Sequence, residues 1–295
     1  MQLLPLSFPE KKKRKSKSSK SSKLCFFPYP GGKFYFTHLI IPIIENTPHQ
    51  TYVEVFGGAG NILLNKKPSK IEIFNDIDDY IVSLFRVIRN PHKFSIFKKL
   101  LEFTPYSRTE FIYLKEKFKN NLYDIHPDIE LSKAYIFYYL TLTSFSGKKE
   151  TFSYTKSKKN KPQQYFNHIK KLILIKQRLE NVIIENLDFQ IIFEKYDTPN
   201  TLFYLDPPYF NIFNLYSFDF SLDDHKRLIS CIKNAKGKII LSGYDNELYQ
   251  NELSSLNKLE FQRKIFLTNS HQLPNHQRQI KTECIWTNFD FNFKL

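Results

Sequence analysis

Four residues that directly follow an apolar stretch, Asp206-Pro207-Pro208-Tyr209, have the clearest potential for chemistry in this sequence. Residues 201–205 (TLFYL) predict a buried strand, and two consecutive prolines cannot continue its hydrogen-bond ladder, so the backbone must leave the sheet there. Asp206 then supplies a carboxylate acceptor, the prolines supply carbonyl acceptors, and Tyr209 supplies a ring on which a flat base can stack. This combination suits the exocyclic amino group of a planar base. The alternative is a plain turn at the end of a strand.

A glycine-rich turn follows an earlier predicted strand, residues 51–56 (TYVEVF), and continues as Gly57-Gly58-Ala59-Gly60. Such a turn lets the backbone approach a ligand closely. The next predicted strand, residues 70–74, is followed by Asn75 and Asp76. Asp76 lies 16 residues after Gly60. An acidic residue near this distance can accept hydrogen bonds from a ribose hydroxyl pair, and the missing G-x-G-x-x-G pattern disfavours a dinucleotide. A turn that only packs a strand against a helix is the alternative.

The third motif is Tyr29-Pro30-Gly31-Gly32-Lys33, which precedes a predicted helix over residues 34–45. The glycine turn would allow Lys33 to direct its ammonium group at a ligand carboxylate near the edge of a sheet, and Tyr29 would supply a packing face. By itself the motif is equally consistent with a linker.

The order of predicted elements indicates an α/β protein. Short apolar strands alternate with residues at helical spacing, which is typical of a doubly wound parallel sheet. The strands are predicted at residues 51–56, 70–74, 182–185, 201–205 and 238–242, a helix begins at residues 61–65, and residues 261–268 and 281–288 form a closing antiparallel pair. We therefore expect a basic tail at 1–24, a catalytic domain at 25–90 and 182–295, and a mainly helical insertion at 91–181.

The charge of the chain points to a polyanionic partner. Lys and Arg number 44 against 29 Asp and Glu, which gives a net charge of +15. Eight of these basic residues lie at 11–23, where the Lys/Ser composition predicts disorder, but the other 36 still exceed the acidic residues. A basic folded body fits nucleic acid. The alternative is a residue bias that an AT-rich genome would produce.

Several classes of protein are excluded. The three widely spaced cysteines, Cys25, Cys231 and Cys284, do not fit a disulfide scaffold or a zinc module. The histidines lack metal-ligand spacing, so we predict no metal site. No stretch approaches the roughly 18 apolar residues of a membrane span, and we predict an intracellular protein, cytoplasmic in a prokaryote. In a eukaryotic host the basic tail could act as a nuclear-import signal.

The motifs and their order resemble the Dam-like (D12 class) adenine-specific DNA methyltransferases. In chain order they are Tyr-Pro-Gly-Gly-Lys, Phe-Gly-Gly-Ala-Gly, Asn-Asp-Ile-Asp and, after a long insertion, Asp-Pro-Pro-Tyr. The resemblance runs from about Phe26 to Asn288 and includes the last predicted strand. It implies a Rossmann-like methyltransferase sheet, S-adenosylmethionine as cofactor, and transfer of a methyl group to N6 of an adenine flipped out of duplex DNA. It also implies double-stranded DNA as partner, a monomer, and a cognate restriction endonuclease as a candidate partner.

The resemblance assigns roles to individual residues. Asp206, Pro207, Pro208 and Tyr209 would be catalytic: Asp206 and the Pro207 carbonyl would accept the two N6 hydrogens, and Tyr209 would stack on the base. Lys33 would meet the methionine carboxylate, Asp76 the ribose, and Asp188 the adenine ring of the cofactor. The full set implied for the cofactor is Tyr29, where the family often has Trp, Lys33, Phe56, Gly57, Gly58, Gly60, Asp76, Asp188, Phe189 and Asp206.

Recognition of DNA is predicted for the insertion. Residues 144–161 (SFSGKKETFSYTKSKKNK) could form a hairpin that enters a groove, with lysines on phosphates and polar side chains on base edges. The candidate DNA contacts are Arg108, Lys148, Lys149, Lys156, Lys158 and Lys159. A solvated basic loop is the alternative, and the segment does not predict a particular target sequence.

Two other functions remain open at this point. One is a methyltransferase that acts on RNA or on cytosine N4, although Asp206 favours adenine by analogy with the family. The other is a nucleic-acid-binding relative without catalysis, which the presence of Lys33, Asp76 and Asp206 argues against.

Overall fold

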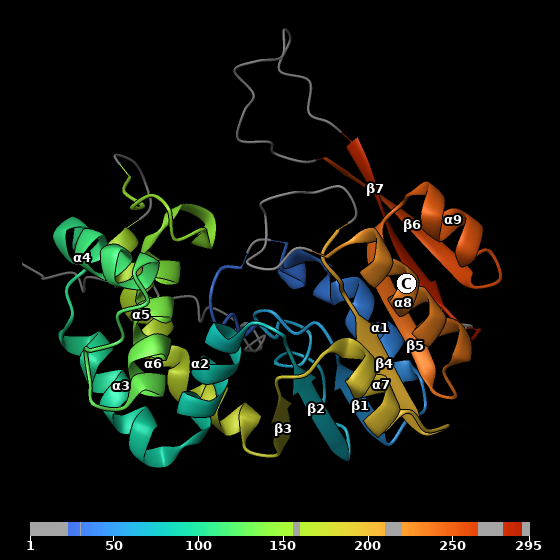
Figure 1. The fold of residues 1–295 in the computed structure, drawn as a ribbon, viewed down its shortest axis with the longest axis horizontal. Coiled ribbons are helices and arrows are strands. Elements are labelled where there is room, and N and C mark those ends of the chain that lie inside the picture. Colours follow the sequence, from blue (N-terminus) through green and yellow to red (C-terminus); the bar gives the residue numbers. More distant parts are fainter. Residues whose placement is uncertain (1–22, 30, 156–159, 210–219, 265–279, 291–295) are drawn as a thin grey trace, which may run out of the picture.

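A computed structural model shows the fold and describes residues 23–29, 31–155, 160–209, 220–264 and 280–290 (Figure 1). A seven-stranded sheet runs through one half of the molecule, and a group of helices from the middle of the chain stands beside its β3 edge. No helix within the described ranges has both the length and the hydropathy that crossing a bilayer requires.

The sheet is the doubly wound sheet that the sequence predicts. Its order is β3-β2-β1-β4-β5-β7-β6, with β1 to β5 parallel and β7 antiparallel to both β5 and β6. Since β2 and β3 lie on one side of β1 while β4 and β5 lie on the other, the winding reverses between β1 and β4. Ligands of such sheets bind at that point, beyond the carboxyl ends of the strands. The strands are β1 (Thr51–Glu54), β2 (Ile71–Asn75), β3 (Val182–Glu185), β4 (Thr201–Leu205), β5 (Lys238–Tyr244), β6 (Asn257–Lys264) and β7 (Ile280–Thr287).

Helices cover both faces of the sheet because its strands are apolar on both sides. Alternate residues of β1 show the division: Tyr52 packs in one core and Val53 in the other. The Tyr52 face carries α1 (Thr37–Asn46) and α2 (Asp79–Arg89). The Val53 face carries α7 (Phe189–Tyr196), α8 (Leu222–Asn234) and α9 (Glu247–Glu252).

The insertion is mainly helical, as expected. It contains α3 (Pro91–Phe103), α4 (Arg108–Lys119), α5 (Ile129–Thr143) and α6 (Lys161–Leu179). The central helix α5 is buried along most of its length, and its residues share one continuous apolar core with α2 and the Tyr52 face of the sheet. The insertion is therefore anchored by hydrophobic packing rather than attached through a flexible linker.

A buried ion cluster also joins the insertion to the sheet. Arg178 of α6 donates to both carboxylate oxygens of Glu72 on β2, at 2.6 and 2.9 Å, and to the Leu63 carbonyl at 2.7 Å. Lys66 binds the same Glu72 carboxylate. Because Leu63 and Lys66 belong to the loop after the glycine turn, this cluster fixes the loop relative to both β2 and α6.

Three local predictions need correction. Residues 61–65 form hydrogen-bonded turns and not the start of a helix. The cause is competition from side chains, since Glu54 accepts the Leu63 N–H while Arg178 binds the Leu63 carbonyl. The helix α7 was not predicted, and β6 begins at Asn257, four residues before the predicted start; residues 265–268 of that prediction lie outside the described residues.

Candidate active site

A cavity open to solvent, with about 700 Å³ of empty space including its open side, lies at the carboxyl ends of β1 and β4, where the winding of the sheet reverses. Three separate motifs of the sequence meet here, because the turn before α1, the glycine turn after β1 and the residues after β4 all reach this edge. The predicted residues that line the cavity are Tyr29, Lys33, Phe56, Gly57, Gly58, Asp76, Asp206 and Pro208.

The glycine turn forms the floor of this cavity. Gly58 has φ +52, a conformation that L-residues with side chains rarely adopt, and a Cβ there would lie 3.1 Å from the Tyr29 ring. A Cβ on Gly57 would overlap the Phe74 ring. Gly60, with φ +64, completes the turn, although it is not among the lining residues. Side chains at these positions would either strain the turn or fill the space that it leaves open.

Asp76 stands at the end of β2 with its carboxylate fixed by the backbone. Oδ2 accepts the Gly58 N–H at 2.7 Å, and Oδ1 accepts the Asp78 N–H at 2.8 Å. Burial raises the pKa of Asp76 to about 7, against the opposing effect of these hydrogen bonds. Each oxygen keeps a lone pair for a ligand hydroxyl group, so the side chain can bind a ribose while it supports the glycine turn.

A second cavity, of about 580 Å³, adjoins the first through Phe56, Ile77 and Pro208. Asp188 and Phe189 line it, at the start of α7. Asp188 caps this helix by accepting the Gln190 N–H at 2.9 Å and also binds Arg227 at 2.8 Å. Apart from Gly60, the predicted cofactor residues are thus distributed over two adjoining cavities.

Lys33, which is buried, and Asp206, which is partly exposed, form an ion pair at the wall of the main cavity. The Lys33 ammonium lies 2.6 Å from Asp206 Oδ1, and the same oxygen accepts from Ser242 Oγ at 3.1 Å. Burial raises the pKa of Asp206, and the Lys33 charge opposes that shift. Burial alone would lower the pKa of Lys33, but Asp206, Tyr204 and Glu283 outweigh it, so the pKa of Lys33 is raised and the ammonium is maintained.

The ammonium of Lys33 has two further partners, the Tyr209 hydroxyl and Glu283 Oε1, the latter at 3.1 Å. The ammonium thus donates hydrogen bonds to Asp206 and Tyr209 and forms an ion pair with Glu283. Contact between Lys33 and a methionine carboxylate, as implied by the family resemblance, would have to replace one of these partners.

Tyr209 packs inward in this structure. Its ring lies 4.3 Å from that of Tyr244, with 38° between the planes, and the Lys33 ammonium lies 4.6 Å from its centroid. Only 9% of Tyr209 is exposed. A flipped base would therefore meet a tyrosine whose hydroxyl and ring are both already positioned by the protein.

Three residues of this site had no predicted role. Glu54 lies on β1 and lines the cavity; it accepts from the Tyr52 hydroxyl and the Leu63 N–H, both at 2.8 Å. Burial raises the pKa of Glu54 to about 8. Ser242 and Glu283 are the other two. In the sequence, Glu54 and Glu283 are single carboxylates inside apolar strands, and this pattern could have indicated a functional role. No feature of the sequence distinguishes Ser242 from other strand residues.

The candidate DNA contacts have different surroundings. The Arg108 guanidinium lies 5.0 Å from the Phe152 ring centroid and 5.2 Å from that of Tyr154. Lys148 is exposed. Lys149 is half-buried with its ammonium 5.0 Å from the Phe137 ring, and burial lowers its pKa, so it is less suited to phosphate contact than Lys148. Lys156, Lys158 and Lys159 lie outside the described residues. In the described part of the predicted hairpin, Ser144 and Phe152 form an antiparallel bridge.

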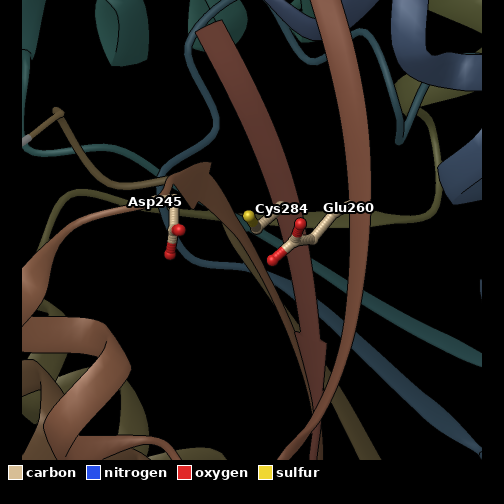
Figure 2. Close-up of side chains that lie close together, drawn as sticks. All are labelled: Asp245, Glu260 and Cys284. Carbon is tan, nitrogen blue, oxygen red and sulfur yellow. The ribbon is translucent and has the colours of Figure 1, made fainter.

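Within the described residues, one group of side chains has the composition of a metal site: Asp245, Glu260 and Cys284, beside β5, β6 and β7 (Figure 2). Lys258, however, lies 2.8 Å from the Asp245 carboxylate and 2.7 Å from that of Glu260. Burial raises the pKa of Cys284 to about 12, so its thiol stays protonated. Carboxylates already paired with an ammonium and a protonated thiol are poor metal ligands. We assign this group as an ion-pair cluster.

Comparison with known proteins identifies the family. The sequence profile of the D12 class N6 adenine-specific DNA methyltransferases matches residues 29–279. The chain is 24% identical over 223 residues to the Type II methyltransferase M.CviBI of Paramecium bursaria Chlorella virus NC1A, which covers 68% of this chain and 76% of that relative. A crystal structure of the Haemophilus influenzae protein HI0767, assigned as a methylase, aligns over 86% of this chain and 89% of its own, with 12% identity and a TM-score of 0.35.

The chain belongs to the D12 class of N6 adenine-specific DNA methyltransferases, and its activity is methylation of adenine N6 in DNA. The family and the fold class predicted from the sequence are thereby confirmed. Membership also implies S-adenosylmethionine as the methyl donor.

Proposed function

We propose that this chain binds S-adenosylmethionine in the two adjoining cavities and methylates N6 of an adenine flipped out of duplex DNA at specific sites. The observation that carries this proposal is the state of the Asp206 carboxylate. In the part of the chain that the structure describes, the side-chain hydrogen bonds to Asp206, from Lys33 and Ser242, both end on Oδ1. Oδ2 is thus the oxygen that can accept a hydrogen bond from a substrate amine.

The charge of the main cavity supports this donor. Three carboxyl groups line it, Asp76, Asp78 and Asp206, against the ammonium of Lys33, and a fourth, Glu54, adds negative charge above its pKa of about 8. S-adenosylmethionine carries a sulfonium and an ammonium group, which such a wall attracts, whereas the pyrophosphate of a dinucleotide would be repelled. The glycine turn leaves room for the ligand, and Asp76 offers acceptors for its ribose.

The residues of the chain then have defined tasks in the reaction. Bound S-adenosylmethionine supplies an electrophilic methyl group. Asp206 Oδ2 and the Pro207 carbonyl accept hydrogen bonds from the two N6 hydrogens and thereby orient the nitrogen lone pair, while Tyr209 stacks on the extruded base. When the nitrogen bonds to the methyl group it becomes cationic and releases one proton, which Asp206 Oδ2 can accept. Lys33 and Ser242 prevent rotation of the Asp206 carboxylate. Catalysis then depends on positioning and fixed dipoles, without a covalent enzyme intermediate.

Binding of the cofactor should depend on Asp76 and on pH. Replacing Asp76 with Asn removes the charge. In addition, the Asn amide nitrogen must face one of the two backbone N–H groups that donate hydrogen bonds to the carboxylate, so one of these hydrogen bonds is lost. We expect S-adenosylmethionine to bind roughly 10- to 100-fold more weakly, since hydrogen bonds to charged groups contribute about 1.5–3 kcal/mol. Wild-type affinity should fall as the pH drops below about 7, where Asp76 becomes protonated.

Calorimetric titration of S-adenosylmethionine between pH 5.5 and 8.5 measures both effects. Glu54, with a pKa of about 8, titrates in both proteins, so the difference between the two curves reports Asp76. Asp79→Asn is a matched control, because Asp79 is half-exposed at the start of α2 and does not line the cavity. Equal affinities of wild type and Asp76→Asn at pH 8 would contradict the assignment of Asp76 to the cofactor.

The insertion, residues 91–181, lies between the two parts of the catalytic domain, and we propose that it is the target-recognition domain. We propose that its lysines contact DNA phosphates. Changing Lys148, Lys156, Lys158 and Lys159 to Gln should weaken DNA binding on all sequences. The slope of log affinity against log salt should fall by about one for each lysine that contacts a phosphate. Lys195→Gln, an exposed change on α7 across the sheet, is the control. An unchanged slope in the fourfold variant would place the DNA elsewhere.

The name of the chlorella-virus relative, a Type II methyltransferase, supports site-specific methylation and a cognate restriction endonuclease as partner. For the oligomeric state, a monomer remains our prediction.

A further inference from the structure

Glu283 is the most deeply buried carboxylate near the proposed catalytic residue. It lies on β7, only 1% of it is exposed, and its register partner on β5 is Tyr244. Its Oε1 lies 3.1 Å from the Lys33 ammonium, which also binds Asp206 Oδ1. One ammonium is thus shared by carboxylates from two different strands.

Lys33 and Asp206 would form a neutral pair without Glu283. Glu283 places a second carboxylate 3.1 Å from the same ammonium. Its charge lies against the cation that binds Asp206, so it acts on the orientation and the charge of the proposed catalytic carboxylate.

We propose that Glu283 is a positioning residue for methyl transfer, which acts through Lys33 on Asp206; this inference rests on the catalytic role proposed above for Asp206. Glu283 holds the Lys33 ammonium from the β7 side, so that Lys33 binds one oxygen of Asp206 in a fixed direction. With Ser242 on the same oxygen, the plane of the Asp206 carboxylate is set and Oδ2 is presented to the amine.

Glu283 also divides the charge of Lys33. A lysine bound only to Asp206 would withdraw more negative charge from that carboxylate and make it a weaker acceptor. The charged and titratable groups that act on Asp206 come from several segments: Lys33 before α1, Glu54 on β1, Tyr204 on β4, Tyr249 on α9 and Glu283 on β7. Among them Glu283 raises the pKa of Asp206, in opposition to Lys33.

Glu283→Gln tests the proposal because it preserves shape and removes the charge. We expect kcat to fall roughly 10- to 100-fold, because the charged partner that holds Lys33 from the β7 side is lost, while KM for DNA and the affinity for S-adenosylmethionine change little. Without the negative charge of Glu283 the pKa of Asp206 falls, so the acid limb of the kcat–pH profile should move to lower pH. Glu283→Asp should recover part of kcat. Glu260→Gln, on the neighbouring β6, is the matched control.

Three results would overturn the proposal. The first is a Glu283→Gln enzyme with wild-type kcat and pH profile. The second is a kcat loss that persists undiminished when Glu283→Gln is added to Lys33→Met, because a residue that acts through Lys33 must lose its effect in that background. A drop in melting temperature with an unmoved pH profile would likewise reduce Glu283 to a structural role. Failure of the proposed function is distinguishable, since wild type and Asp206→Ala would then be equally active.

Discussion

Replacing Asp206 with alanine is expected to lower kcat for methyl transfer roughly 1000-fold, which is within the range for loss of a positioned acid–base or electrostatic group. The variant removes the acceptor for N6 and leaves the amine lone pair unoriented. The fold should persist, because Lys33 keeps Glu283 as a buried partner and no core side chain is lost. Affinity for S-adenosylmethionine should change much less than kcat.

Single-turnover methylation of a mixed-sequence duplex measures this effect separately from product release. Asp206→Asn adds a second test, since it retains an oxygen acceptor without the charge and should recover only a small part of the rate. Asp223→Ala, an exposed substitution on α8, controls for the loss of a carboxylate. An Asp206→Ala enzyme within about threefold of the wild-type rate would contradict the proposed mechanism; a tenfold change in rate corresponds to about 1.4 kcal/mol.

Replacing Lys33 with methionine is the second change with a large expected effect. It removes the shared cation between Asp206 and Glu283, and breaking a buried ion pair destabilises a protein by roughly 3–5 kcal/mol. The pKa of Asp206, which Lys33 lowers, should rise further. A larger fraction of Asp206 will then be protonated at any given pH, so kcat should fall about 100-fold and recover partly as the pH rises.

The measurement is a kcat–pH profile at a temperature well below the melting point of the variant, together with thermal unfolding. Lys67→Met is the control, because the Lys67 side chain is 84% exposed and pairs only at the surface with Glu45. An acid limb that does not move to higher pH in Lys33→Met would show that Lys33 does not control the ionisation of Asp206.

Much of the fold could be predicted from local patterns. The strands and helices alternate, and the prolines after β4 and the glycines after β1 mark the places where the backbone must leave the sheet. The turn at residues 61–65 could not be predicted, because its conformation depends on Glu54 and on Arg178, which is more than 100 residues away. Hydrophobic periodicity does not register such side-chain competition for backbone groups.

The site was predictable as a set of residues but not as a network. Lys33, Asp76 and Asp206 each follow or precede a recognisable turn, and the strand order brings them together. Their contacts with Glu283 and Ser242 depend on the pairing of β7 with β5 and of β5 with β4, which no local spacing determines. The resemblance assigned roles to Lys33 and Tyr209 but did not predict their hydrogen bonds. In the structure Lys33 donates to Asp206 and to the Tyr209 hydroxyl, and so links the two residues.

The most direct test of the central claim identifies the methylated base. The protein would be incubated with labelled S-adenosylmethionine and, in separate reactions, mixed-sequence duplex DNA or RNA, with Asp206→Ala in parallel, and the nucleic acid digested to nucleosides. We expect label in N6-methyladenine with the wild type and its loss in the variant. Label in N4-methylcytosine, label in RNA but not in DNA, or equal label with both proteins would contradict adenine-N6 transfer at Asp206.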